Sequence, residues 1–300
     1  MQKDNSNYVA LVTGASSGIG LELTRKLLSE GWQVAALIRS DFPADDPQLQ
    51  ASRQRSQLRV YKADVSDYGS LRKGLEQIKA TEAKLDVLFN NAGGSFEKLL
   101  FSPQGRELHY EVQTVAPYII TMELAELLGQ GELKRIVNTS SNAFDFVKQF
   151  DPAELERPKV FKKLTGPYAT AKLAMSLWGR AVAPQLEQEY GIRLRSVDPG
   201  PNNTLRKGKS SGLPFYVRPL MKLFFPPPTR GASFLYEGAM STSPAGSLLA
   251  KGQVKELPFL AQGRGTRAGR SYLPRAIFGI VRTCQRSLTV RSAIHDFERQ

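Results

Sequence analysis

Residues 13–20 read Thr13-Gly14-Ala15-Ser16-Ser17-Gly18-Ile19-Gly20, a glycine-rich turn between two patterned stretches. Residues 8–12 before it form an uncharged apolar run, which is typical of a strand buried on both faces. Residues 21–30 after it carry apolar side chains at helical spacing and end at Gly31. Glycines here would let the backbone approach a pyrophosphate, whose charge then lies at the helix N-terminus. The turn is therefore a candidate dinucleotide site, although its G-x-x-x-G-x-G spacing by itself also fits an ordinary turn.

Apolar runs and helical patterns alternate through the first two hundred residues. Further strands are predicted at 33–38, 58–61, 85–89, 135–139 and 192–197, with a last strand at about 252–254. Helices are predicted between them, the clearest at about 67–81, 105–128 and 168–190. Strands that alternate with helices indicate a parallel sheet covered on both faces. We predict an α/β fold with one doubly wound parallel sheet of about seven strands, in a single domain over residues 1–262.

The composition argues against several classes of protein. The single cysteine, Cys284, excludes an internal disulfide framework and fits a reducing compartment. His109 and His295 are far apart, so no metal site is expected. The N-terminus is polar and no apolar stretch approaches the ~20 residues of a membrane span. We expect a cytoplasmic protein with a sizeable core.

The net charge of +13 is concentrated late in the chain. Between Arg264 and Arg299 there are eight arginines against two acidic residues. Residues 263–300 thus form a basic C-terminal extension. It is consistent with a solvated surface, a peripheral contact with an anionic membrane, or nucleic acid. No nucleic-acid reading motif accompanies it, so no nucleic-acid partner is expected.

Two residues at predicted strand ends bear on the adenosine half of a dinucleotide. Arg39 follows the second strand, where a cation suits a 2′-phosphate and an acid suits a free 2′-hydroxyl. We therefore favour NADP(H) over NAD(H), although nearby Asp41 weakens the signal. Asp64, after the third strand, is placed to accept from an adenine amino group or to cap the next helix.

Three further residues form a candidate proton-transfer set. Tyr168 and Lys172 are four positions apart, so they face the same way on one helix. A nearby ammonium is expected to lower the tyrosine pKa from its usual ~10, making Tyr168 a general acid/base. Ser141, at the end of a neighbouring strand, could hold the substrate oxygen. Taken singly, each of these features is common in proteins without such a site.

The ordered set is more specific than its members. The glycine turn, Asn90-Asn91-Ala92-Gly93, Ser141, Tyr168 with Lys172, and Pro199-Gly200 follow one another along the chain. In this order they resemble the short-chain dehydrogenase/reductase family over roughly residues 7–260, nearest its retinol dehydrogenase and WW-domain oxidoreductase branch. The resemblance implies a Rossmann-type fold and an NADP(H)-dependent oxidoreductase that interconverts a carbonyl and an alcohol.

The resemblance also implies roles for individual residues. Tyr168 would exchange the proton of the substrate oxygen, Lys172 would depress its pKa and bind the nicotinamide ribose, and Ser141, rather than Ser140, would hold the substrate. Members of the family often pair subunits through their two long central helices, so the resemblance also implies that a homo-oligomer is possible. The cofactor would lie against Gly14, Ser16, Ser17, Gly18, Ile19, Gly20, Arg39, Asp64, Val65, Asn91, Ala92, Gly93, Tyr168, Lys172, Pro199, Gly200 and Thr204.

Some segments depart from the family pattern. Gln113 stands where many members have an asparagine that completes a proton relay, and Ala116-Pro117 replaces a later glycine. Ser141 and Tyr168 are 27 positions apart, and the intervening segment 144–167 is either a lid or rim beside the substrate or a surface excursion. The loop 201–228 is apolar and aromatic, which indicates a lipophilic carbonyl or alcohol, ordinary packing, or a membrane-touching hairpin.

Two alternatives to the oxidoreductase follow from these departures. Gln113 and the basic extension are consistent with a cofactor-binding regulatory protein that does little chemistry. The extension alone is consistent with nucleic-acid binding, which would be salt-sensitive and lost on removing residues 264–300.

Overall fold

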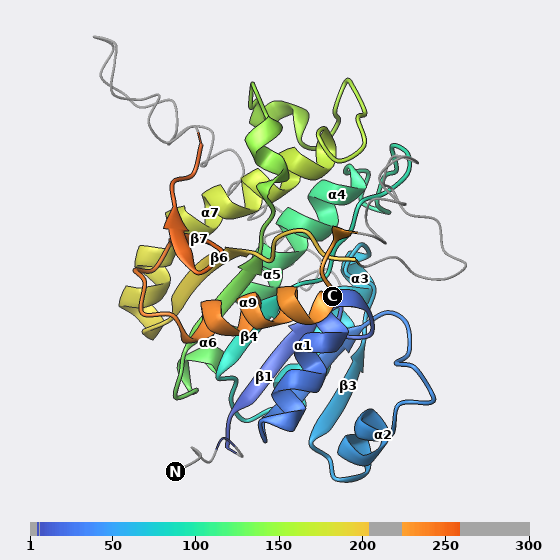
Figure 1. Cartoon of the computed structure of the whole chain (residues 1–300), viewed down its shortest axis with the longest axis vertical. Helices are drawn as coiled ribbons and strands as arrows, with labels where there is room; N and C mark the ends of the chain where they lie inside the picture. The colour runs from blue at the N-terminus through green and yellow to red at the C-terminus, as the bar shows by residue number, and fades with distance from the viewer. Residues whose placement is uncertain (1–4, 6, 204–223, 259–300) are drawn as a thin grey trace, which may run out of the picture.

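One eight-stranded sheet organises the computed structural model, which describes residues 5, 7–203 and 224–258 (Figure 1). The strand order is β3-β2-β1-β4-β5-β6-β7-β8. Strands β1 to β7 are parallel, and β8 is antiparallel to β7. The strands are β1 Val9–Thr13, β2 Gln33–Ile38, β3 Leu58–Lys62, β4 Val87–Asn90, β5 Arg135–Thr139, β6 Arg193–Asp198, β7 Leu248–Ala250 and β8 Gln253–Lys255.

The helices connect these strands and cover both faces of the sheet. They are α1 Gly18–Ser29, α2 Pro47–Gln54, α3 Tyr68–Thr81, α4 Leu108–Tyr110, α5 Ala116–Glu123, α6 Ala125–Gly129, α7 Pro167–Tyr190 and α9 Pro228–Met240. Two short 3-10 helices, Asn142–Phe146 and Pro152–Glu154, lie in the segment before α7. The predicted α/β fold with helices on both faces is confirmed.

The prediction of about seven strands is corrected to eight. The expected last strand at 252–254 is β8, and β7 had not been recognised separately. Strand β7 has only three residues, too few for a hydrophobic pattern to show. Lys251 and Gly252 between the two strands both have positive φ, 51° and 77°, as a tight two-residue hairpin requires.

Alternate side chains of each buried strand enter two different cores. In β1, Leu11 packs with α3, α5 and α7, whereas Ala10 and Val12 pack on the other face with α1 and α9. Figure 1 shows α1 and α9 together on the near side of the sheet. Because both faces are buried, the central strands are continuously apolar, which is the pattern that predicted them.

The helix predicted over 105–128 is interrupted. A π-helical turn, Glu111–Val115, separates α4 from α5, and the Ala116 N–H donates to the Glu111 carbonyl, five residues back. Pro117 follows at the start of α5 and has no N–H to give to the Gln113 carbonyl, so the regular α pattern cannot continue through this point. The Ala116-Pro117 pair thus reshapes the helix on which Gln113 lies.

The site is located by the topology. Strands β1 and β4 are neighbours, yet the chain leaves β1 toward β2 and leaves β4 toward β5, on opposite sides. At such a switch point the connecting loops diverge and leave a crevice outside the carboxyl ends of the strands. The glycine turn follows β1 at this crevice.

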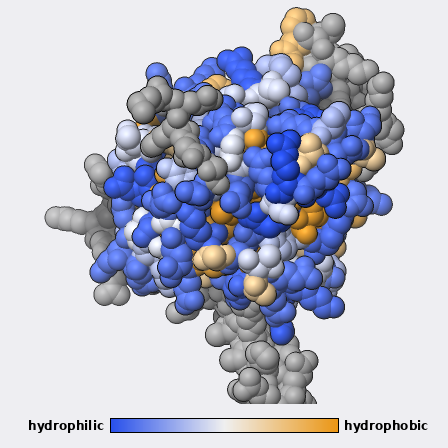
Figure 2. Space-filling view, turned by 90° about the horizontal axis from the view of Figure 1, so that it is seen from below, coloured by the Kyte–Doolittle hydropathy of each residue, from blue (hydrophilic) through white to orange (hydrophobic). Residues whose placement is uncertain are grey.

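The lower side of the molecule in Figure 1 is mostly hydrophilic, with small hydrophobic spots (Figure 2). Within the described ranges, no helix is long and apolar enough to cross a membrane. Thr204, most of the loop 201–228 and the extension 263–300 lie outside the described residues, so the expectations for them remain predictions.

Candidate functional site

The glycine turn packs against the end of β4 at van der Waals distance. Gly14 has φ +66°, and a Cβ on it would lie 2.8 Å from the Ala92 Cα. A Cβ on Gly20 would lie 2.3 Å from the Gly14 carbonyl oxygen and 2.5 Å from Asn91 Nδ2. No L side chain fits either position without moving backbone. Glycine is therefore required at both positions for the turn to pack this closely against itself and against the end of β4.

Thr13 joins the glycine turn to the end of β4 by hydrogen bonds. Its Oγ1 accepts the N–H groups of Asn91 and Ala92, each at 2.9 Å, and Asn91 Nδ2 donates to the Thr13 carbonyl at 3.0 Å. The expected grouping of Asn91 with the cofactor turn is thus present. The role of Thr13 had not been foreseen, because a threonine ending a strand carries no distinctive pattern.

Arg39 lies at the carboxyl end of β2, as predicted, and its side chain is 71% exposed. Its Nη1 is 3.1 Å from Asp64 Oδ2, across from the end of β3. Burial disfavours the charged form of Asp64, but hydrogen bonds from Ser66 and the Arg39 guanidinium outweigh it and hold its pKa below the usual value. Arg39 is therefore an accessible cation whose present partner is a carboxylate.

These residues fit a dinucleotide cofactor. The first turn of α1 contains no acidic side chain, so its amide groups are open to an anion. Most predicted cofactor residues lie at the carboxyl ends of β1 to β6 and are partly exposed, whereas Gly20 and Pro199 are buried. Residues arranged in this way around the switch point are Gly14, Ser16, Ser17, Gly18, Ile19, Arg39, Asp64, Val65, Asn91, Ala92, Gly93 and Gly200.

Ser141 and Tyr168 meet at the same edge. The Ser141 hydroxyl accepts the Ala143 N–H at 3.2 Å and is hydrogen-bonded to the Tyr168 side chain. The Ser140 hydroxyl instead bonds Ser176 Oγ at 2.8 Å in the interior. Ser141, partly exposed, is therefore the serine that faces the tyrosine, as predicted.

Lys172 lies one turn further into α7 and is 4% exposed. Its Nζ donates to the Thr139 carbonyl at the end of β5, at 2.5 Å. Burial lowers the pKa of Lys172 to about 7, and the Asp198 carboxylate opposes this only in part. The lysine thus changes charge near neutral pH.

The expected lowering of the Tyr168 pKa is not found. Burial raises the pKa of Tyr168, and the negative charge of Asp198 raises it further, against a hydrogen bond from Ser141 that lowers it. Desolvation of the phenolate outweighs that hydrogen bond. Asp198, at the end of β6, was expected only as part of the Asp198-Pro199-Gly200 turn; its electrostatic effect on both groups depends on the fold.

Gln113 is buried beside the loop that follows β4. Its Nε2 donates to the Gly94 carbonyl at 3.2 Å, while its Oε1 has no hydrogen-bond partner. An unpartnered buried amide oxygen has room for a further donor such as water. Gln113 thus lies on the π-helical turn Glu111–Val115 rather than on the uninterrupted helix that the sequence predicted.

Glu107 and His109 are buried side chains near Tyr168 that the sequence had not singled out. The imidazole Nδ1 is 2.6 Å from Glu107 Oε1, and its ring lies edge-on to the Tyr168 ring, with centroids 5.9 Å apart. Glu107 caps the N-terminus of the short helix α4 and His109 lies within it, and only the fold brings them to Tyr168. No His/Cys/Asp/Glu group in the described part of the chain could hold a metal ion.

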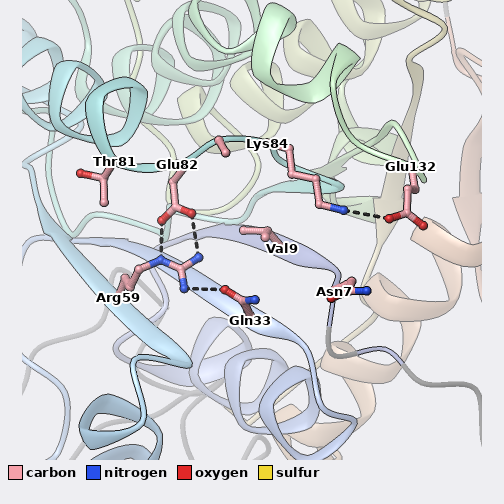
Figure 3. A pocket seen from close by; sticks show the side chains of 9 residues that line it. Asn7, Val9, Gln33, Arg59, Thr81, Glu82, Lys84 and Glu132 are labelled. Carbon is pink, nitrogen blue, oxygen red and sulfur yellow. Dashed lines mark hydrogen bonds and ion pairs between the residues drawn. The ribbon is translucent and has the colours of Figure 1, made fainter.

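A separate hollow of about 530 Å³ opens at the amino ends of the strands, away from this site (Figure 3). Its charged side chains pair with one another. Arg59 forms two hydrogen bonds of 2.7 Å with Glu82, and Lys84 Nζ lies 2.9 Å from Glu132 Oε1. These groups neutralise each other and offer a ligand no uncompensated charge.

The chain is similar to known short-chain dehydrogenases. The family described as short chain dehydrogenase matches residues 8–151, a range that ends before Tyr168. Retinol dehydrogenase 12 of Mus musculus is 32% identical over 194 residues, covering 64% of this chain and 60% of the relative. Retinol dehydrogenase 11 of Mus musculus is 31% identical over 220 residues, covering 72% of this chain and 67% of the relative.

Solved structures share the fold. A blue fluorescent protein from a metagenomic library, solved with NADPH, superposes with TM-score 0.61 at 22% identity, covering 83% of this chain and 98% of its own. Salutaridine reductase from Papaver somniferum gives TM-score 0.58 at 17% identity, covering 81% and 99%. The chain thus spans a full fold of this type but only about 60% of the length of retinol dehydrogenase 12.

Proposed function

This chain belongs to the short-chain dehydrogenase/reductase family, and from that membership we propose that it is an NADP(H)-dependent oxidoreductase. It would interconvert a carbonyl and an alcohol on a lipophilic substrate. The observation that carries the proposal is the convergence of Ser141, Tyr168 and Lys172 at the carboxyl edge of the sheet, beside a bare glycine turn.

The bound nicotinamide would supply or take up the hydride. The chain's own residues would handle the proton. The Tyr168 hydroxyl donates a proton to the substrate oxygen in reduction, and the Tyr168 phenolate accepts the proton of the alcohol in oxidation. Ser141 Oγ accepts the Ala143 N–H, which leaves its own proton available to donate to the oxygen of Tyr168 or of the substrate. Protonated Lys172 favours the phenolate and so lowers the barrier to proton release.

The cofactor preference rests on Arg39. Its exposed guanidinium would leave Asp64 for a 2′-phosphate, which carries more charge than a carboxylate and binds arginine by paired hydrogen bonds. A lipophilic substrate is supported by the apolar composition of the loop 201–228 and by the retinol dehydrogenase relatives.

The test is a fluorescence titration of the full chain with NADPH and, separately, NADH, followed by a panel of lipophilic aldehydes, ketones and alcohols. Tyr168→Phe is expected to lower kcat by about 10²-fold or more while cofactor binding is retained. Tyr190→Phe, at the other end of α7, is the matched control. Full turnover by Tyr168→Phe would contradict the mechanism, and preference for NADH would contradict the role of Arg39.

A regulatory, cofactor-binding protein is the second candidate. It is favoured by the raised pKa of Tyr168 and by Gln113 in place of asparagine. Tight cofactor binding without turnover of any member of the panel would select it.

A further inference from the structure

We propose that Glu107 and His109 form a buried clamp that positions Tyr168 for proton transfer. The clamp rests on the proposed function, since it gives Tyr168 the role described above. It contacts the tyrosine ring from the start of α4. Figure 1 shows α4 at the same end of the molecule as the start of α7, and the two helices are in contact.

The first step is that the pair is held in one arrangement. His109 Nε2 accepts the Phe96 N–H at 2.9 Å, so that nitrogen carries no proton. The proton is therefore on Nδ1, which donates to Glu107 Oε1 at 2.6 Å. The other carboxylate oxygen of Glu107 accepts the Tyr110 N–H at 2.9 Å. Every polar atom of the two side chains has a partner, so the ring can neither flip nor rotate without losing a hydrogen bond.

The second step is burial. Glu107 is 0% and His109 1% exposed. A hydrogen-bonded carboxylate–imidazole pair in the interior gains little stability over apolar side chains of similar volume. What it offers instead is a fixed ring orientation, because its hydrogen bonds are directional whereas apolar packing is not.

The third step is what the fixed ring touches. The imidazole meets the Tyr168 ring edge-on, with an interplanar angle of 81°. It also contacts the rings of Phe96, at 4.6 Å, and Phe161, at 6.3 Å between centroids. Phe96 belongs to the loop after β4 and Phe161 to the segment before α7. One side chain thus joins three segments around the tyrosine.

The fourth step is that Tyr168 needs an external support. It is the second residue of α7, where the helix has only begun. Toward its hydroxyl it meets Ser141, and the charge of Asp198 acts on it from β6. Its ring is held by the clamp. His109 does not itself carry a proton to the substrate, because both its nitrogens are engaged; it is a positioning residue.

The experiment compares His109→Ala with Leu75→Ala, a buried control on α3. Three quantities are measured: NADPH affinity, kcat, and the titration midpoint of Tyr168. The midpoint comes from tyrosinate absorbance, as the difference between each protein and its Tyr168→Phe derivative, so it does not need turnover. His109→Ala is expected to lower kcat about 10- to 100-fold with NADPH affinity within about twofold. The midpoint should fall, because water reaching the ring would solvate the phenolate.

Two further variants separate positioning from simple packing. His109→Phe restores a ring beside Tyr168 without the two hydrogen bonds, so it is expected to recover the midpoint, because water is again excluded, while kcat stays low. Phe161→Ala removes one of the rings that contact the imidazole but keeps both hydrogen bonds of His109. This variant replaces His109→Ala in the experiment if His109→Ala does not fold. Its effects on kcat and on the midpoint should have the same sign as those of His109→Ala and be smaller. An unchanged midpoint in folded His109→Ala, full recovery of kcat by His109→Phe, or equal changes in Leu75→Ala would overturn the clamp. Absence of turnover in the wild type with a midpoint shift as expected would instead overturn the proposed function alone.

Discussion

Replacing Lys172 with methionine should stabilise the fold at neutral and acidic pH while abolishing the function proposed for the lysine. The folded-state pKa of Lys172 is about 7, and its ordinary value is 10.5. Between these values the unfolded chain binds more protons than the folded one, so the stability of the wild type rises with pH across this window. Below pH 7 the full penalty of burying the charge is present. Methionine has no charge to bury, so its advantage should be largest there and fade toward pH 10.

The magnitude follows from the shift. The difference in unfolding free energy between the variant and the wild type should change by about 4 kcal/mol between pH 6 and pH 10, as the integrated proton linkage gives. Loss of the hydrogen bond to the Thr139 carbonyl lowers the stability of the variant by about 1–3 kcal/mol at every pH. That loss does not alter the pH dependence, so the pH-dependent part isolates the buried charge.

Urea unfolding of wild type and Lys172→Met at several pH values between 6 and 10 measures this difference. Lys159→Met, at an exposed lysine paired with Glu154, is the control and should show little pH dependence. A change of under about 1 kcal/mol between the two ends of the range, or one of opposite sign, would refute the reasoning that Lys172 is desolvated in the folded protein.

Three other changes test the site. Gly20→Ala should weaken NADPH binding at least about 10-fold, because its Cβ would lie 2.3 Å from a backbone oxygen, whereas Gly69→Ala, with its nearest contact at 3.4 Å, should bind normally; equal affinities would contradict the close packing of the turn. Arg39→Ala should weaken NADPH by about 10- to 100-fold in a fluorescence titration and leave NADH nearly unchanged, and a parallel loss for both would rule out a 2′-phosphate contact. Asp198→Asn removes a negative charge that raises the pKa of Tyr168, so the pH profile of turnover should move to lower pH; a profile that stays or moves upward would show that this charge does not act on the tyrosine.

Local sequence patterns were sufficient to predict those parts of the candidate site that are formed by residues close together in the chain. The glycine turn and the pairing of Tyr168 with Lys172 on α7 both follow from spacing. The residue that caps α3 is Asp67 rather than Asp64, the cap that the sequence suggested. The alternation of buried strands and helices predicted a parallel sheet. In a parallel sheet the carboxyl ends of the strands lie at one edge, so the alternation also predicted the edge at which these residues meet. Strand β7 was not predicted because three residues carry too little pattern. The Ala116-Pro117 pair was recognised as a departure, but the π-helical turn before α5 was not predicted, because a proline's missing N–H acts on a carbonyl one turn away.

The sequence by itself determined the fold class, the residues at the strand ends and the order of the proposed catalytic set, since each depends on periodicity or on short-range geometry. Only the tertiary structure decided their electrostatics. It buried Lys172 and Tyr168, brought the Asp198 charge to act on both, turned Ser141 rather than Ser140 to the tyrosine, and laid His109 against its ring. Burial and charge act on a pKa through space. The distances involved are fixed only when the strands pair, so the order of residues along the chain does not predict these pKa shifts.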